Sequence, residues 1–188
     1  MIDPFAALVP PYEVILVDPP WTYYGSRDKW GAAAKFYPTM TDLELTSLPI
    51  ASLLADKSVL FCWATSARID FTIECLGHWG LSFRGIQFVW VKTKKDGTPL
   101  GAQGVRPSIV KPICEYVVAG SKVRRGRPLP LSAEDICQTV FAPKAEHSTK
   151  PEAVQERIEQ MYPTARKLEL FARKPREGWD AWGDEVTW

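Results

Sequence analysis

The chain has 188 residues, of which 46% are hydrophobic and 24% charged, and its formal net charge is +1. This composition supports a sizeable core, and it excludes a disordered chain and a wholly basic protein that coats nucleic acid. One domain over residues 1–188 is expected from the length. Because the sequence shows no basic leader and no apolar run long enough to span a bilayer, we expect a soluble, cytoplasmic protein without membrane contact.

The cysteines and histidines do not form a metal-binding pattern. The sequence has no Cys-x-x-Cys pair, and its only histidines are His78 and His147. We therefore expect no metal site and reduced thiols. The four cysteines are widely spaced, at Cys62, Cys75, Cys114 and Cys137.

Strands and helices are expected to alternate along the chain. In chain order the patterns predict a strand at 14–17, a helix at 41–48, a strand at 59–63, a helix at 67–79, strands at 86–91 and 114–119, a helix at 152–162 and a strand at 167–171. The first helix opens with a Thr-x-x-Glu capping box. The second places Ile69, Ile73 and Leu76 on one face. This alternation predicts an α/β fold with a mainly parallel sheet covered on both faces.

The first predicted strand ends in the sequence Asp18-Pro19-Pro20-Trp21. Ligands bind at the carboxyl ends of strands in open parallel sheets, so Asp18 stands where chemistry is expected. The prolines fix the backbone, which holds the carbonyl groups of this turn in set directions. The Asp18 carboxylate and the Pro19 carbonyl would accept the two hydrogens of a nucleobase amine while Trp21 stacks on the ring. The alternative is a strand-ending turn with a core tryptophan.

Three irregular stretches separate the predicted elements. Residues 22–38 carry several aromatic side chains, and residues 93–112 carry glycines and lysines, so both suit covers over a base-binding pocket. Residues 121–146 are expected to form an extended surface connection.

Three basic clusters flank strand ends, and solvated surface is the ordinary interpretation of each, whereas the alternative is that they bind a phosphate backbone together. They are Lys92, Lys94 and Lys95; Arg106 and Lys111; and Lys122, Arg124, Arg125 and Arg127.

A second candidate region lies near the carboxyl terminus. The segment 147–152 opens a helix whose free amide groups favour an anion, and Lys150 adds a positive charge there. Asp184 and Glu185, near the end of the chain, are placed to accept hydrogen bonds from ribose hydroxyls. The alternatives are an ordinary helix start and a solvated acidic pair.

Five motifs in a fixed order resemble one known family over residues 14–186. They are Asp-Pro-Pro-Trp at 18–21, Tyr-x-Thr-Met at 37–40, Val-Lys-Thr at 91–93, His-Ser-Thr-Lys-Pro-Glu at 147–152 and Arg-Lys-Leu-Glu-Leu-Phe-Ala-Arg at 166–173. The chain is similar to the family of the catalytic subunit of the mRNA adenosine-N6 methyltransferase, which includes bacterial and phage DNA adenine methyltransferases. The resemblance implies a Rossmann-like, class I S-adenosylmethionine-dependent methyltransferase fold with the permuted motif order of the beta class.

The resemblance also implies roles for individual residues. The turn from Asp18 to Trp21 would hold the target adenine, with Asp18 near the methionine part of S-adenosylmethionine. The other implied contacts are Tyr37 and Glu115 with the target nucleotide, Lys150 with the cofactor carboxylate, Phe171 and Arg173 with the adenosine, and Asp184 and Glu185 with the ribose hydroxyls. Relatives commonly carry an amide at one or both of the last two positions, whereas both are acidic here.

The expected reaction is transfer of a methyl group to N6 of adenine, in DNA rather than RNA because no appended domain is seen. The acceptors at Asp18 and Pro19 would orient the amine and stabilise its developing positive charge, so no cysteine nucleophile is needed. A homodimer or a second subunit could supply further nucleic-acid contacts. The alternatives are an RNA methyltransferase, a catalytically silent relative that only binds nucleic acid or a partner, and an enzyme with another nucleotide cofactor. The last lacks a Gly-x-Gly-x-x-Gly or phosphate-loop motif.

Overall fold

A seven-stranded sheet forms the centre of the molecule, with the strand order β5-β3-β4-β2-β1-β6-β7. The computed structural model describes residues 4–21, 39–101, 109–144, 149–184 and 186. The strands are β1 (Tyr12–Val17), β2 (Leu54–Thr65), β3 (Ser82–Thr93), β4 (Cys114–Ser121), β5 (Thr139–Pro143), β6 (Lys167–Leu170) and β7 (Trp179–Trp182). The helices are α1 (Asp42–Thr46), α2 (Ile50–Leu53), the 3-10 helix η2 (Ser66–Arg68), α3 (Ile69–His78) and α4 (Glu152–Met161).

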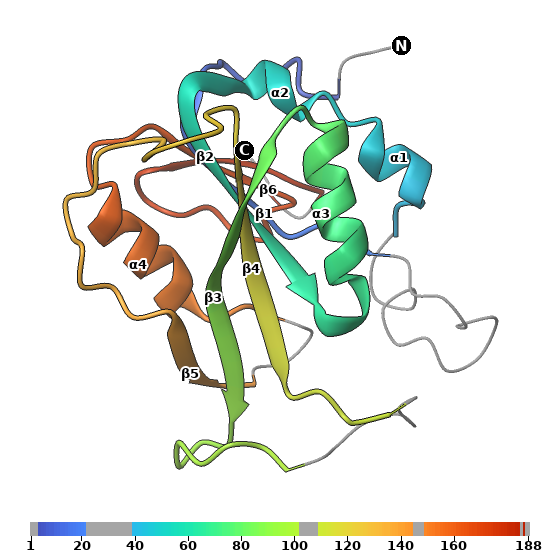
Figure 1. The fold of residues 1–188 in the computed structure, drawn as a ribbon, viewed down its shortest axis with the longest axis vertical. Helices are drawn as coiled ribbons and strands as arrows, with labels where there is room; N and C mark the ends of the chain where they lie inside the picture. The colour runs from blue at the N-terminus through green and yellow to red at the C-terminus, as the bar shows by residue number, and fades with distance from the viewer. Residues whose placement is uncertain (1–3, 22–38, 102–108, 145–148, 185, 187–188) are drawn as a thin grey trace.

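Helices cover both faces of this sheet, and each covered face has its own core. On the α3 face, Ile15 and Val17 of β1 pack with Leu76 of α3. On the α4 face, Val14 and Leu16 pack with residues of α4. Figure 1 shows α3 and α4 on different sides of the strands. Because β1 is buried on both faces, its residues Val14 to Val17 form a continuous apolar run, as a central parallel strand requires. The predicted Rossmann-like α/β fold is confirmed.

Strand β4 runs antiparallel to its neighbours β2 and β3, whereas the other adjacent strands are parallel. The parallel strands therefore end at one edge of the sheet, which we call the carboxyl edge, and β4 begins there. The opposite edge, called the amino edge, is where the parallel strands begin and β4 ends.

The reversed direction of β4 corrects one prediction about the basic clusters. The cluster from Lys122 to Arg127 follows the end of β4, so it lies at the amino edge, while Lys92 lies at the carboxyl edge. The Lys122 ammonium donates to the Leu54 carbonyl over 2.7 Å, and Arg127 pairs with Glu134 over 2.5 Å. The prediction that all three clusters bind one phosphate backbone together is therefore wrong for this third cluster. Arg106 lies outside the described residues.

Local signals explain where the helices begin. Thr41 and Glu44 form the predicted capping box, in which the Glu44 carboxylate accepts from the Thr41 amide over 2.7 Å and the Thr41 hydroxyl accepts from the Glu44 amide over 3.3 Å. The second predicted helix is shorter than expected, because a 3-10 turn precedes α3. Its predicted inward residue Ile73 is 37% exposed. The residues of α3 that are buried are Thr72, Cys75 and Leu76.

Two strands were not expected from the sequence. Strand β5 lies inside the stretch predicted as a surface connection, and its five residues end in a proline. Strand β7 has the sequence Trp-Asp-Ala-Trp, which pairs with β6 over four residues. Both are short edge strands, and four or five residues give too few repeats for a periodic signal.

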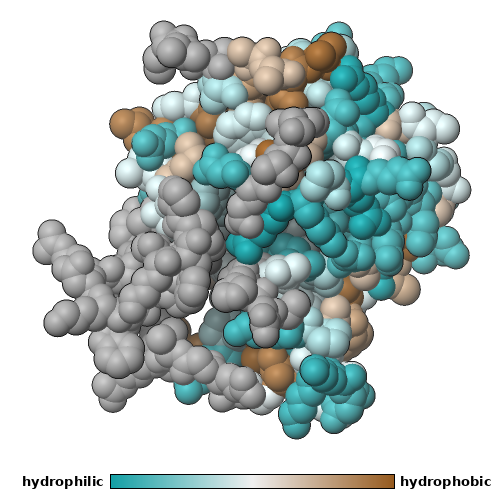
Figure 2. Space-filling view, turned by 180° about the vertical axis from the view of Figure 1, so that it is seen from behind, coloured by the Kyte–Doolittle hydropathy of each residue, from teal (hydrophilic) through white to brown (hydrophobic). Residues whose placement is uncertain are grey.

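Among the described residues, none of the helices is long and apolar enough to cross a membrane. In the view from behind, hydrophilic residues dominate one side of the described surface, and hydrophobic residues gather only in small groups (Figure 2). That face therefore presents no broad apolar area in the described part of the chain.

Candidate active site

A row of side chains crosses the α4 face of the sheet at its carboxyl edge. The strand registers produce it, because residues directly opposite each other on paired strands point to the same face. Glu115 lies opposite Trp90 of β3 and Thr65 of β2, and Glu169 lies beside Leu16 of β1. In order from β3 to β6, the row is Lys92, Glu115, Trp63, Asp18 and Glu169.

Asp18 and Lys150 form the central pair of this row, although they are 132 residues apart in sequence. The Lys150 ammonium lies 2.8 Å from each oxygen of the Asp18 carboxylate. Asp18 follows β1, and Lys150 lies two residues before α4. The carboxyl end of β1 and the amino-terminal end of α4 therefore meet at this pair. The side chains are 21% and 19% exposed, which leaves the pair accessible to a ligand while water screens it only partly.

Charges alternate from this pair toward β3. Glu115 lies 3.5 Å from the Lys150 ammonium and 2.5 Å from the Lys92 ammonium. The Lys150 ammonium also lies 5.4 Å from the centroid of the Trp63 ring, and the Lys92 ammonium 5.0 Å from that of Trp90. Each ammonium group therefore makes a cation–π contact with one of these rings. Lys92, predicted as a surface phosphate contact, instead fixes a carboxylate inside the site.

Glu169 is a site residue that the sequence analysis did not select. Burial, with a smaller contribution from the nearby Asp18 carboxylate, raises its pKa to about 7, although a hydrogen bond from Gln155 of α4 lowers it. That bond joins the Gln155 amide nitrogen to Glu169 Oε2 over 2.8 Å. A single carboxyl inside the apolar strand Leu-Glu-Leu was the signal that could have revealed it.

The Asp18-Pro19-Pro20-Trp21 turn is fixed by backbone hydrogen bonds. The Trp21 amide donates to the Pro19 carbonyl over 2.8 Å, and the Met40 amide donates to the Pro20 carbonyl over 3.0 Å. A carbonyl oxygen can accept two hydrogen bonds, so Pro19 retains one acceptor site.

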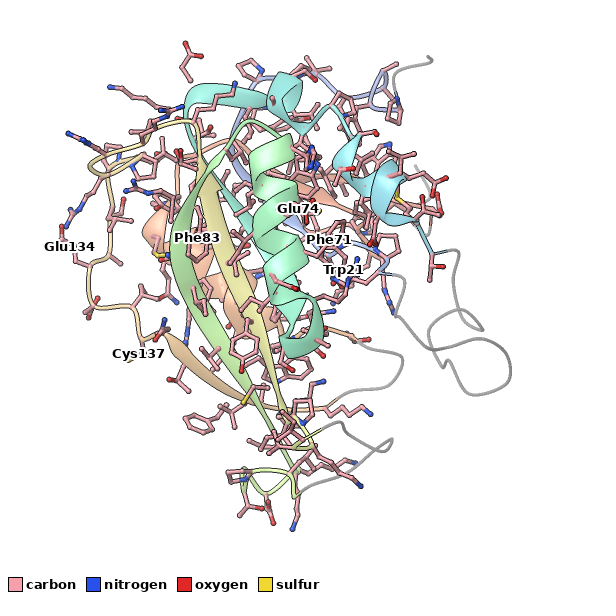
Figure 3. All side chains as sticks on the ribbon, turned by 45° about the vertical axis from the view of Figure 1, so that its right-hand side comes forward. Trp21, Phe71, Glu74, Phe83, Glu134 and Cys137 are labelled. Carbon is pink, nitrogen blue, oxygen red and sulfur yellow. The ribbon has the colours of Figure 1, made fainter. Side chains whose placement is uncertain are left out.

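Trp21 itself is 4% exposed. Its ring packs edge-on to Phe71 at 6.1 Å, beside the start of α3 (Figure 3), and 5.7 Å from the Arg68 guanidinium. This burial fits the alternative interpretation of Trp21 as a core residue that anchors the turn, and its stacking on a base stays a prediction.

The carboxyl-terminal candidates lie at the same edge, after β6 and β7. Phe171 has a left-handed backbone with φ of 61°, and its ring packs edge-on to Trp182 at 5.3 Å. A Cβ on Gly183 would lie 2.3 Å from the Ala172 carbonyl oxygen, so only glycine lets these two connections approach so closely. Arg173 is half-buried and Asp184 is exposed. The predicted site residues Tyr37 and Glu185, and also His147, lie outside the described residues.

Metal ligands do not cluster within the described ranges, where no group of three or more His, Cys, Asp or Glu side chains is placed to hold an ion. The site instead consists of lysines and carboxylates in alternation, with two indole rings beneath them.

Comparison with known proteins gives matches over nearly the whole chain. The MT-A70 family matches residues 12–185. The type II methyltransferase M.MunI of Mycoplasma sp is 33% identical over 93% of this chain and 78% of its own length. The N(6)-adenosine-methyltransferase MT-A70-like of Arabidopsis thaliana is 29% identical over 94% of this chain, and the N(6)-adenosine-methyltransferase catalytic subunit METTL3 of Homo sapiens is 30% identical over 86%. The chain spans only 24% and 26% of the lengths of these two relatives.

Proposed function

Since the chain belongs to the MT-A70 family of adenine-N6 methyltransferases, we propose that its carboxyl-edge site transfers the methyl group of S-adenosylmethionine to N6 of an adenine in DNA. The observation that carries this proposal is the Asp18 carboxylate, held by Lys150 directly after β1. DNA is favoured because the chain spans 78% of the type II methyltransferase M.MunI, whereas it spans only about a quarter of the N(6)-adenosine-methyltransferases that it matches. The described elements are proposed to form one domain.

The residues at the carboxyl edge fit S-adenosylmethionine by their chemistry. Its methionine part carries a carboxylate and an ammonium group, and the Lys150–Asp18 pair offers the complementary charges side by side. Phe171 and Arg173 would hold the adenosine, and Asp184 and Glu185 would accept hydrogen bonds from the ribose hydroxyls. Bound S-adenosylmethionine supplies a methyl group on a sulfonium, which is a strong electrophile.

The protein's own contribution is orientation and charge stabilisation. The lone pair of the adenine amine is delocalised into the ring, so the amine attacks only when its hydrogens are held out of the ring plane. Asp18 accepts one hydrogen at a carboxylate oxygen, and the remaining acceptor site of the Pro19 carbonyl accepts the other. The carboxylate also stabilises the positive charge that develops on the nitrogen, and it is the first acceptor for the proton that must leave.

A covalent route through a cysteine is disfavoured at this site. Cys62 is the cysteine nearest the turn, because it pairs with Val17 in the β1–β2 register. Its side chain is fully buried, and burial raises the pKa of its thiol well above the ordinary value. A protonated, inaccessible thiol is a poor nucleophile.

The substrate side of the site is proposed to lie around Glu115, with Tyr37 lining the adenine pocket. Lys94 and Lys95 follow β3 at the same edge and are exposed, so they suit the phosphate backbone. A homodimer or a second subunit is proposed as a source of further contacts. METTL3, of which this chain spans a quarter, is named as the catalytic subunit of its enzyme.

An RNA substrate and a catalytically silent relative are the alternatives, and one experiment separates all three. The purified protein is incubated with S-adenosylmethionine and random-sequence DNA or RNA, and the products are digested and searched by mass spectrometry for N6-methyladenine nucleosides. We expect the deoxy form, and Asp18→Asn should lower the rate about a thousandfold or more. Asp180→Asn, at the amino edge, is the matched control and should keep the rate. Product in RNA alone would overturn the DNA proposal, and no product in either would overturn the enzymatic one.

A further inference from the structure

The hydroxyl of Thr65 is buried at the carboxyl edge and has no hydrogen-bond partner in the described part of the chain. Thr65 is the last residue of β2 and lies directly opposite Glu115 of β4. It therefore points to the α4 face, two residues beyond Trp63, where the row of charged side chains lies.

A threonine at this position would ordinarily cap a helix, but the Thr65 side chain does not. Thr65 is the N-cap residue of η2, and an N-cap threonine usually accepts a hydrogen bond from an amide of the first turn. Here the side chain makes no capping bond. Buried hydroxyls are nearly always paired, and an unpaired one destabilises the free protein. Its position at the edge of a site points to a partner that arrives with the substrate.

The neighbours of Thr65 restrict what that partner can be. Asp18 and Glu115 carry acceptor oxygens, and the Lys92 and Lys150 ammonium groups are directed at those two carboxylates. The Thr65 hydroxyl therefore offers an uncharged donor beside this row, which neither its carboxylates nor its ammonium groups supply. An adenine whose amine is bound by Asp18 has two ring acceptors beside that amine, N1 and N7, and each of them needs a donor.

We propose that the Thr65 hydroxyl donates a hydrogen bond to N1 or N7 of the target adenine, which makes Thr65 a base-recognition residue. This inference rests on the proposed function. Less than 1 Å² of the hydroxyl oxygen is exposed, so the contact forms only after the groups above it shift aside.

A second unpaired hydroxyl in the molecule provides a matched control. Thr93 is the last residue of β3, is 2% exposed, and also has a buried hydroxyl without a partner among the described residues. Because Lys92 precedes it and side chains alternate along a strand, Thr93 points to the face opposite the site. Valine at either position removes the hydroxyl and keeps the shape.

The test combines protein variants with base analogues. The methylated sequence is first identified in random DNA, and oligonucleotides are then made with adenine, 1-deazaadenine or 7-deazaadenine at the target position. Wild type, Thr65→Val, Thr65→Ser and Thr93→Val are compared by melting temperature, by kcat/KM for each oligonucleotide, and by calorimetric affinity for S-adenosylmethionine.

Opposite changes in stability and recognition are expected for Thr65→Val. Its melting temperature should rise by about 2–4 °C, while kcat/KM for adenine falls about tenfold and cofactor affinity stays unchanged. One deaza analogue should erase the difference from wild type, and it identifies the ring nitrogen. Thr65→Ser should keep wild-type kinetics, and Thr93→Val should rise in melting temperature without changing the relative kcat/KM values for the three bases.

Two outcomes would overturn the role of Thr65. The first is a Thr65→Val variant with wild-type kcat/KM, and the second is an equal loss on all three bases. An inactive wild type would instead overturn the proposed function, and base recognition with it, so the two failures are distinguishable.

Discussion

The two edges of the sheet both pair charged side chains within the protein, but they differ in the groups that surround those pairs. There the Asp180 carboxylate accepts hydrogen bonds from the Tyr12 hydroxyl over 2.7 Å and from Arg166 over 2.9 Å, and the Arg166 guanidinium lies 4.5 Å from the Tyr12 ring centroid. At the carboxyl edge, two lysines share two carboxylates, while burial raises the pKa of Glu169 to about 7 and the Thr65 hydroxyl has no partner within the ranges that the structure describes. A closed cluster serves stability, whereas groups left perturbed or unpaired mark a site that a ligand completes.

Replacing the central cation of each edge should give the largest contrast. Lys150→Met leaves Asp18 and Glu115 without their shared ammonium, so affinity for S-adenosylmethionine should fall about thirtyfold or more. Arg166→Met, at the amino edge, should leave that affinity unchanged and lower the melting temperature slightly, because the Arg166 side chain is 43% exposed. Isothermal titration calorimetry and thermal unfolding measure the two effects. Equal affinity losses in both variants would contradict the distinction between the edges.

Glu169 at the carboxyl edge should make the free energy of unfolding depend on pH in the opposite sense to an ordinary paired carboxylate. Its pKa is about 7 in the folded protein against an ordinary value of 4.5, so the folded state binds this proton more tightly than the unfolded chain. The resulting stabilisation is complete below about pH 4.5 and is lost as the pH rises through 7. The Asp18 carboxylate opposes ionisation, while Lys174 and Arg176 favour it.

Glu169→Gln removes this titration and keeps the shape of the side chain. The variant should match wild type at about pH 4.5 and below, and be more stable above pH 7 by about 3 kcal/mol. Thermal unfolding of both proteins across this range measures the difference. Parallel curves would show that Glu169 does not titrate near neutrality.

The smallest effect is expected from Tyr12→Phe at the amino edge. The variant loses the hydrogen bond to Asp180, which should cost about 1 kcal/mol and lower the melting temperature by about 2–4 °C. Methyl transfer should be unaffected. Burial, together with Asp180, raises the pKa of Tyr12 to about 12, so wild type alone should lose this increment of stability between pH 10 and 12. A change in kcat with unchanged stability would argue against a purely structural amino edge.

The sequence was sufficient for elements whose signal is local. The apolar run of β1 and the Thr41–Glu44 capping box lie where they were expected, because burial on both faces and cap chemistry are written in adjacent residues. The family and its reaction also followed from motif order. Short edge strands such as β7 could not be predicted, since their pairing partner rather than their own sequence stabilises them.

The site was only partly predictable for the same reason. Asp18 was found because a motif marks it, but the roles of Lys92 and Glu169 depend on contacts across several strands. The reversed direction of β4 was also invisible in the sequence. Because of it, the basic residues after Ser121 and those after Thr93 lie at opposite ends of the strands.

The ion pair between Lys92 and Glu115 joins the end of β3 to the beginning of β4, and backbone bonds reinforce it there: the Lys92 amide donates to the Ile113 carbonyl over 3.1 Å, and the Leu100 amide donates to the Lys92 carbonyl over 2.9 Å. The connection between the two strands is therefore fixed at both of its ends. Since lengthening a connection costs little free energy once its ends are fixed, we expect changes in the length of this connection to leave the Lys92–Glu115 pair in place.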